Sequence, residues 1–144
     1  ETTVDVLKCI VKESRDFGMY VHDGATVTAT QCEFIENGYN GVYCMDANTK
    51  ARLNDCTMHH NGSNGLEAYG HAVVDLHGTN TNIHSNKGNG FYASLYAKVN
   101  IHLPSQHNTS HDNVWDNRLQ EEGGSIANIN ADGTFTHVEE VDDD

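Results

Sequence analysis

CTMHHNGSNGLEAYGHAVVDLHG, residues 56–78, contains glycine turns and four histidines but no apolar stripe of helical length. The preceding stretch, CEFIENGYNGVYCMDANTKARLND at residues 32–55, has the same outline. Three residue types recur every 23 to 25 residues and mark the register: cysteine at Cys9, Cys32 and Cys56, glycine at Gly18, Gly41, Gly65 and Gly90, and asparagine at Asn37, Asn61 and Asn86. Such a recurrence is an internal repeat with the period of a solenoid.

Within each repeat, apolar and polar residues alternate in three short bursts. This two-residue period predicts strands and is incompatible with helices. In the second full repeat the inward pairs are Cys32 with Phe34, Val42 with Cys44, and Ala51 with Leu53. Three strands that each have one apolar side close into a triangular coil, here called a rung.

Stacked rungs place each strand about 4.8 Å from its equivalent in the next repeat, which predicts parallel sheets with like residues in columns. Residues 4–103 resemble the right-handed parallel β-helix repeat of pectate lyases, polygalacturonases and related carbohydrate-binding and sugar-hydrolase domains. The resemblance implies that Asn37, Asn61 and Asn86 stack in a tight turn, where we expect them to adopt the left-handed backbone conformation. We therefore predict an all-β, right-handed parallel β-helix of about five rungs, each with three short strands.

The 144 residues are enough for one domain and too few for a second core. Asn113 continues the asparagine column, but VWDNRLQEEGG, residues 114–124, carries no apolar second strand. The closing segment resembles the ends of uncharacterised β-helix proteins of unicellular algae, and four of its apolar residues are expected to cover the last rung: Ile126, Ile129, Phe135 and Val138. We divide the chain into repeats (4–103), a degenerate rung with a cap (104–138) and an acidic tail (139–144).

The first residues are in register with the third strand of a rung, since Val4 and Val6 match Val27 and Ala29. The chain is thus expected to begin partway round a rung, as a trimmed fragment would. Open strand edges pair readily with other chains, so end-to-end self-association is an expected interaction. No signal peptide or membrane-spanning stretch is recognised.

Charge and cysteine content limit the partners. A net charge of −13 disfavours nucleic acid and anionic membranes. Cysteines stacked one rung apart are too distant for ordinary disulfides, so Cys9, Cys32, Cys44 and Cys56 are expected to be buried, reduced thiols. Reduced thiols favour an intracellular location, whereas glycosylation triplets at Asn61 and Asn108 favour the opposite, and the location stays unassigned.

The outward positions of the third strand carry the richest chemistry. The repeat aligns Arg52, Asp75 and Asn100 in one column and Asn54, His77 and His102 in the next. The resemblance places this face where pectin-degrading enzymes bind substrate, so Arg52 is a candidate to neutralise a uronate, with His77 or Asp75 as the proton carrier. The motifs of polygalacturonases and the calcium carboxylates of pectate lyases are absent, and the alternative is an ordinary Arg52–Asp75 pair on a solvated face.

Two further outward columns contain rings. Tyr20 and Tyr43 are expected to stack on the second sheet, where exposed aromatics suit sugar rings or a protein partner, although tyrosine also favours strands in general. His59 stacks over His84 on the first sheet, as His77 does over His102, and protonation would set each pair in repulsion. A structural zinc site needs four ligands, so we expect no metal and no other cofactor, with His59 and His84 as the weak candidates.

The sequence thus favours a non-catalytic binding or scaffolding module with a polysaccharide or protein ligand. Its expected ligand-binding residues are Arg52, Asp75, His77, Asn100, His102, Tyr20 and Tyr43. The alternative is a carbohydrate-active enzyme, a lyase, hydrolase or epimerase, that uses the face of the third strand.

Overall fold

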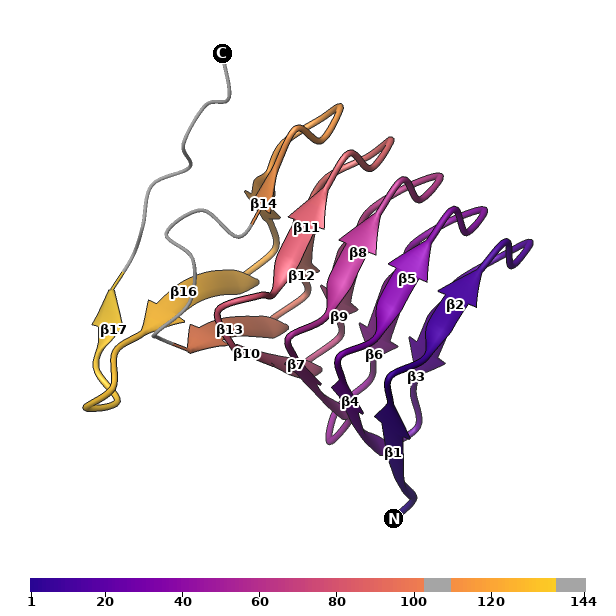
Figure 1. Cartoon of the computed structure of the whole chain (residues 1–144). Coiled ribbons are helices and arrows are strands. Elements are labelled where there is room, and N and C mark those ends of the chain that lie inside the picture. The colour runs from indigo at the N-terminus through magenta and orange to yellow at the C-terminus, as the bar shows by residue number, and fades with distance from the viewer. Residues whose placement is uncertain (103–109, 137–144) are drawn as a thin grey trace.

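A computed structural model of the chain describes residues 1–102 and 110–136. All elements within these residues are strands, and they form three sheets that wrap one core (Figure 1). Sheet A contains β1 (Thr3–Leu7), β4 (Thr26–Thr30), β7 (Lys50–Asn54), β10 (Val73–His77), β13 (Lys98–His102), β16 (Ser125–Ile129) and β17 (Phe135–Thr136). Sheet B contains β2 (Ile10–Lys12), β5 (Glu33–Ile35), β8 (Thr57–His59), β11 (Asn82–His84) and β14 (Ser110–His111). Sheet C contains β3 (Met19–Val21), β6 (Val42–Met45), β9 (Leu66–Tyr69), β12 (Phe91–Ser94) and β15 (Arg118–Gln120).

Each strand pairs in parallel with its equivalents in the neighbouring rungs, as the repeat predicted. In sheet A, for example, Leu76 lies opposite Leu53 on one side and Ile101 on the other. Only β16 and β17 pair antiparallel among the described strands. The predicted parallel β-helix of about five rungs is therefore confirmed.

The inward side chains make one continuous apolar core along the rungs. Phe34, Met58 and Ile83 form its column on sheet B, and all three are fully buried. Cys32, Cys44 and Cys56 are buried free thiols, and burial raises the pKa of Cys44 to about 12 and of Cys56 to about 11. Cys44 and Cys56 therefore stay protonated, and all three buried residues pack as small apolar groups.

The expectation that Cys9 is buried is wrong, because its side chain is exposed. Cys9 belongs to the first rung, which has a neighbouring rung on one side only in the described chain. Val4, an inward position of the same rung that lies opposite buried Val27, is 43% exposed for the same reason. The one-sided cover thus exposes some inward side chains of the first rung, although Val21 on β3 is buried.

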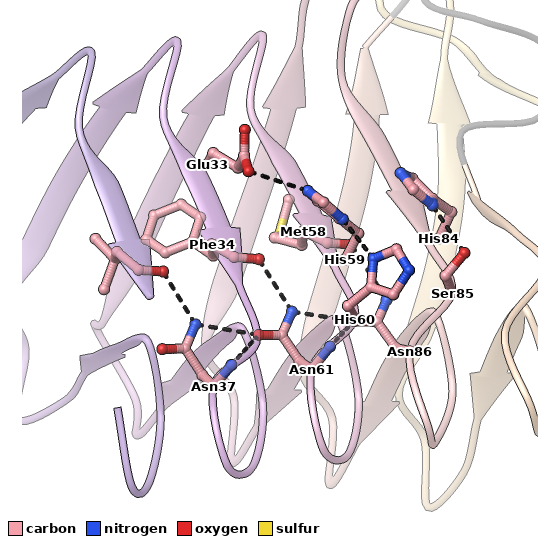
Figure 2. Close-up of polar contacts among 11 residues, drawn as sticks. Glu33, Phe34, Asn37, Met58, His59, His60, Asn61, His84, Ser85 and Asn86 are labelled. Carbon is pink, nitrogen blue, oxygen red and sulfur yellow. Dashed lines mark hydrogen bonds and ion pairs between the residues drawn. The ribbon is translucent and has the colours of Figure 1, made fainter. Parts of the chain in front are cut away.

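The asparagine column links the rungs through the turn between sheets B and C (Figure 2). Asn61 Oδ1 accepts hydrogen bonds from the Asn37 backbone N–H and side-chain amide, each 3.1 Å long. The Asn61 amide donates to Phe34 O and to Asn86 Oδ1 at 3.1 and 3.0 Å. Asn113 extends the column as predicted, since its Oδ1 accepts from Asn86.

The expected left-handed conformation lies one residue earlier than predicted. Positive φ angles occur at the residue before each column asparagine: Glu13 before Ser14, then Glu36, His60, Ser85 and Asp112. The asparagines themselves keep negative φ, and their amides bridge rungs instead. The residue type that marks a turn is therefore not the residue that reverses the backbone.

A second asparagine column, absent from our sequence interpretation, lies three residues after the first. Asn64 N–H donates to Asn40 Oδ1 at 3.0 Å, and Asn89 N–H donates to Asn64 Oδ1 at 2.9 Å. The spacing N-x-x-N, repeated at Asn37, Asn61 and Asn86, was the available signal. Two columns of side-chain hydrogen bonds thus hold the same edge of the helix.

The last rung differs from the prediction at two points. β15 forms at residues 118–120 and pairs with β12 although its inward positions are not apolar, because a preformed sheet edge supplies the hydrogen bonds. Ile126 and Ile129 are buried as expected, but Phe135 is 72% exposed and does not cover the core. Val138 and the acidic tail lie outside the described residues.

The described residues include no helix that is long and apolar enough to cross a bilayer.

Candidate functional site

The outward side chains of β4, β7, β10 and β13 form a polar surface, named here the sheet A face. The register places Asp75 opposite Arg52 and Asn100, and His77 opposite Asn54. Both predicted columns therefore exist. In the second column the His77 and His102 rings stack with centroids 4.1 Å apart and planes inclined by 10°.

The carboxylate of Asp75 is bound by two groups from the next rung. His102 Nε2 lies 2.6 Å from Asp75 Oδ1, and the Asn100 amide donates to the same oxygen at 3.2 Å. Asp75 and His102 are both about one-third exposed, so solvent screens the pair only partly. A half-buried Asp–His pair therefore lies at the centre of the sheet A face.

The Arg52–Asp75 pair of the alternative interpretation does not form. Arg52 Nε donates instead to Asn54 Oδ1 at 3.2 Å, two residues along its own strand. The cause is competition: Asp75 has donors on β13, and Asn54 offers Arg52 an acceptor on the same side of β7. The Arg52 guanidinium consequently remains exposed to solvent.

The surroundings of His77 on this face shift its pKa. Burial lowers the pKa of His77 below its usual value, and the nearby His102 and Arg52 charges lower it further, whereas Asp75 opposes the change. His77 is therefore a neutral imidazole at neutral pH, able both to donate and to accept one hydrogen bond.

Basic side chains gather on this face despite the acidity of the chain. Lys50 and Lys98 lie on either side of Val73 in the column next to Arg52, and all three basic groups are exposed. They are three of the eight Lys and Arg residues in a chain of net charge −13. The sheet A face therefore concentrates positive charge on an otherwise acidic protein.

The predicted tyrosine pair on sheet C also forms. The Tyr20 and Tyr43 rings stack with centroids 5.1 Å apart, and Phe17 packs against both. Burial raises the pKa of Tyr43 to about 12, so the phenol stays protonated. Tyr20 is 44% exposed and presents the accessible ring of this cluster.

Glu67 lies opposite Tyr43 and Tyr92 in the same column and is held by the second asparagine column. Its carboxylate accepts from Asn40 at 2.8 Å and from Asn64 at 3.1 Å. Burial raises the pKa of Glu67, while these two amide donors oppose the rise. Sequence inspection alone gave Glu67 no role, because its partners come from turns whose asparagines were not recognised as a column.

The histidine column on sheet B forms and is longer than predicted. The His84 ring stacks on His59 at 4.8 Å and on His111 at 5.1 Å. Stacked rings have parallel nitrogen lone pairs, so His59 and His84 do not converge on one ion in this arrangement. The only group of three or more His, Cys, Asp and Glu ligand atoms that lie together in the described residues consists of His22, Asp23 and Asp46.

Comparison with protein-family models agrees with the fold. A family model described as "Right handed beta helix region" matches residues 1–110. No curated protein and no solved structure matches the chain.

Proposed function

The chain belongs to the right-handed β-helix family, and we propose that the sheet A face makes it a non-catalytic module that binds acidic polysaccharide. The inward side chains pack in the core, so a ligand meets only the outward ones. Arg52, Lys50 and Lys98 provide the charge that attracts uronate or sulfate groups. His77, Asn54 and Asn100 provide neutral donors and acceptors for sugar hydroxyls.

The observation that carries the proposal is the clustering of positive charge. An acidic protein repels an acidic polymer at long range, so binding needs a local surface of opposite sign. Lys50 and Arg52 on β7 and Lys98 on β13, two strands away in the same sheet, supply such a surface. All three side chains are exposed to solvent and accessible to a ligand, although Arg52 Nε also donates to Asn54 Oδ1.

The repetition of the face suits a polymer. In-register strands repeat the same outward positions at every rung, about 4.8 Å apart. A polymer can then contact polar side chains on several successive rungs, as a compact ligand cannot. The Tyr20 ring on sheet C supplies a separate surface for stacking on a sugar ring.

The proposal is tested by binding to uronate and sulfated polymers on a glycan array, followed by titration of the best ligand. The test variant carries Lys50→Gln, Arg52→Gln and Lys98→Gln. Loss of three exposed charge contacts, each worth roughly 0.5 kcal/mol, predicts about tenfold weaker binding.

The matched control removes the same charge elsewhere, through Lys8→Gln, Lys12→Gln and Arg15→Gln in the first rung. Its affinity is expected to fall less than threefold, because only the net charge changes. Equal losses in the two triple variants would show that the sheet A face is not the binding surface. Absence of any bound polymer would remove the glycan-binding proposal and leave a scaffolding role.

One observation favours a second function, that of a carbohydrate-active enzyme. Asp75 orients His102 at 2.6 Å, which is the arrangement that a histidine base requires. In this alternative Arg52 neutralises a uronate carboxylate and His102, rather than His77, accepts the proton. Formation of unsaturated uronate or new reducing ends by the wild type, and its loss in His102→Gln, would establish turnover.

A further inference from the structure

Two consecutive histidines at the end of β8 face one another through the same ring atom. His59 Nδ1 and His60 Nδ1 are 2.6 Å apart, and the rings meet edge to face (Figure 2). Neighbouring residues of a strand ordinarily point to opposite sides. Here the φ angle of 56° at His60 turns its side chain back toward His59.

The same backbone turn recurs in the next rungs with different chemistry. His84 Nδ1 contacts Ser85 Oγ at 2.9 Å, and His111 Nδ1 contacts Asp112 Oδ2 at 2.9 Å. In those pairs an oxygen meets the imidazole nitrogen and completes an ordinary hydrogen bond or ion pair. The His59–His60 pair instead brings two imidazole nitrogens together.

Glu33 determines which His59 nitrogen can act as a ligand. Glu33 Oε1 lies 3.2 Å from His59 Nε2 (Figure 2), and an ionised carboxylate can only accept, so the proton resides on Nε2. The lone pair of His59 is then on Nδ1, facing His60. A carboxylate behind a histidine in this way is the usual outer support of a metal ligand.

We propose that His59 Nδ1 and His60 Nδ1 bind a late first-row divalent metal ion, supported by Glu33, with solvent in the remaining coordination positions. Metal–nitrogen bonds of about 2.0–2.1 Å place two adjacent ligands roughly 2.9–3.4 Å apart, so the rings need to separate by less than about 1 Å. His60 is exposed on a turn and can make this movement. The ion takes the place of the proton that the two nitrogens otherwise share.

The ligand type predicts the choice of metal. Two imidazoles favour Cu²⁺, Ni²⁺ and Zn²⁺ over Ca²⁺ and Mg²⁺, which prefer oxygen, and Cu²⁺ forms the strongest such complexes. The separate group of His22, Asp23 and Asp46 has two carboxylates and provides the comparison site. His84 is not one of the proposed ligands, because its ring lies face to face with His59.

The test is calorimetric titration of the protein, without a histidine tag, with CuCl₂ and with ZnCl₂. His60→Ser removes one ligand and reproduces the His84–Ser85 pairing, including a serine that adopts a φ of 57°. We expect one saturable site in the wild type, with Cu²⁺ bound more tightly than Zn²⁺, and at least tenfold weaker binding in His60→Ser. Glu33→Gln is expected to weaken binding about tenfold, the effect typical of losing an outer-shell carboxylate.

His22→Ser is the matched control, since it alters the comparison site and leaves His59 and His60 in place. Unchanged affinity in His22→Ser, together with nitrogen couplings from two imidazoles in the Cu²⁺ electron paramagnetic resonance spectrum, would support the proposed site. Equal affinity in the wild type and His60→Ser would overturn the proposal. Loss of binding in His22→Ser or the absence of saturable binding in the wild type would do the same.

Discussion

Replacement of Asn61 by alanine tests how strongly the asparagine column stabilises the fold. Asn61 is fully buried, and its side chain makes four hydrogen bonds across two rung boundaries. The substitution leaves the Asn37 backbone N–H without this acceptor and Phe34 O without this donor. The other two partners keep a second bond, because Asn37 Nδ2 also donates to Val11 O and Asn86 Oδ1 also accepts from the Asn61 backbone.

The expected cost follows from these contacts. A net hydrogen bond contributes about 1 kcal/mol, and a buried polar group left unpaired costs about 1–3 kcal/mol. Asn61→Ala removes four hydrogen bonds, and two of the partner groups, the Asn37 backbone N–H and Phe34 O, lose their bond to Asn61. The free energy of unfolding is therefore expected to decrease by about 3–5 kcal/mol. This loss is large compared with a typical domain stability of about 5–15 kcal/mol.

The assay is urea unfolding followed by far-ultraviolet circular dichroism. Asn54→Ala is the matched control, because Asn54 lies in the preceding repeat on the half-exposed sheet A face, where it bonds Arg52 and Thr30. Its expected cost is below about 1 kcal/mol, because water can replace partners that lie at the surface. Equal losses in the two variants would refute the view that the column carries a large share of the stability.

Three further predictions follow from the register, the His77 pKa and the open first rung. Leu76→Asp buries an unpaired charge and is expected to lower the free energy of unfolding by more than about 4 kcal/mol or to unfold the protein. Asp75→Leu is expected to lower it by about 1 kcal/mol, because Asp75 faces outward. Equal losses of the two variants in urea unfolding would contradict the alternation of inward and outward side chains. Because the pKa of His77 is lowered, the unfolded chain binds a proton at this histidine at higher pH than the folded chain does, so its contribution to stability is complete above the unfolded pKa, about 6.5, and is lost as the pH falls toward the folded pKa. The melting temperatures of wild type and His77→Gln, measured between about pH 7 and 5, should therefore converge at low pH. A constant difference between the two proteins across this range would count against the prediction. Val4→Lys, at an inward and 43% exposed position of the first rung, is expected to weaken end-to-end self-association in sedimentation experiments, and an oligomer that survives the change must use another surface.

Periodicity predicted the fold because every rung must bury apolar side chains at the same positions of its three strands. Alternation identified Leu53, Leu76 and Ile101 as one inward column, and spacing alone aligned His77 with His102. These features depend on register, which the sequence displays directly. The same reasoning placed the outward columns that the proposed function uses.

Two kinds of feature were not predictable in this way: those that depend on which side chains compete for the same hydrogen-bond partner, and those that depend on the position of a rung along the β-helix. The choice of Asp75 for His102 rather than Arg52 depends on side-chain geometry that spacing does not reveal. Cys9 repeats the pattern of buried Cys32, yet its exposure reflects its place in the first rung. The His59–His60 contact arises from a left-handed residue whose position the asparagine pattern misassigned by one.

The most direct test of the proposed function is to map binding of an acidic oligosaccharide by two-dimensional nuclear magnetic resonance. The account predicts the largest amide shifts in β7, β10 and β13, at Lys50–Asn54, Val73–His77 and Lys98–His102, with changes in the ring signals of His77 and no change in the sugar spectrum over time. Shifts confined to sheet B or sheet C, or the appearance of product signals from the oligosaccharide, would contradict the claim that the sheet A face is a non-catalytic binding surface.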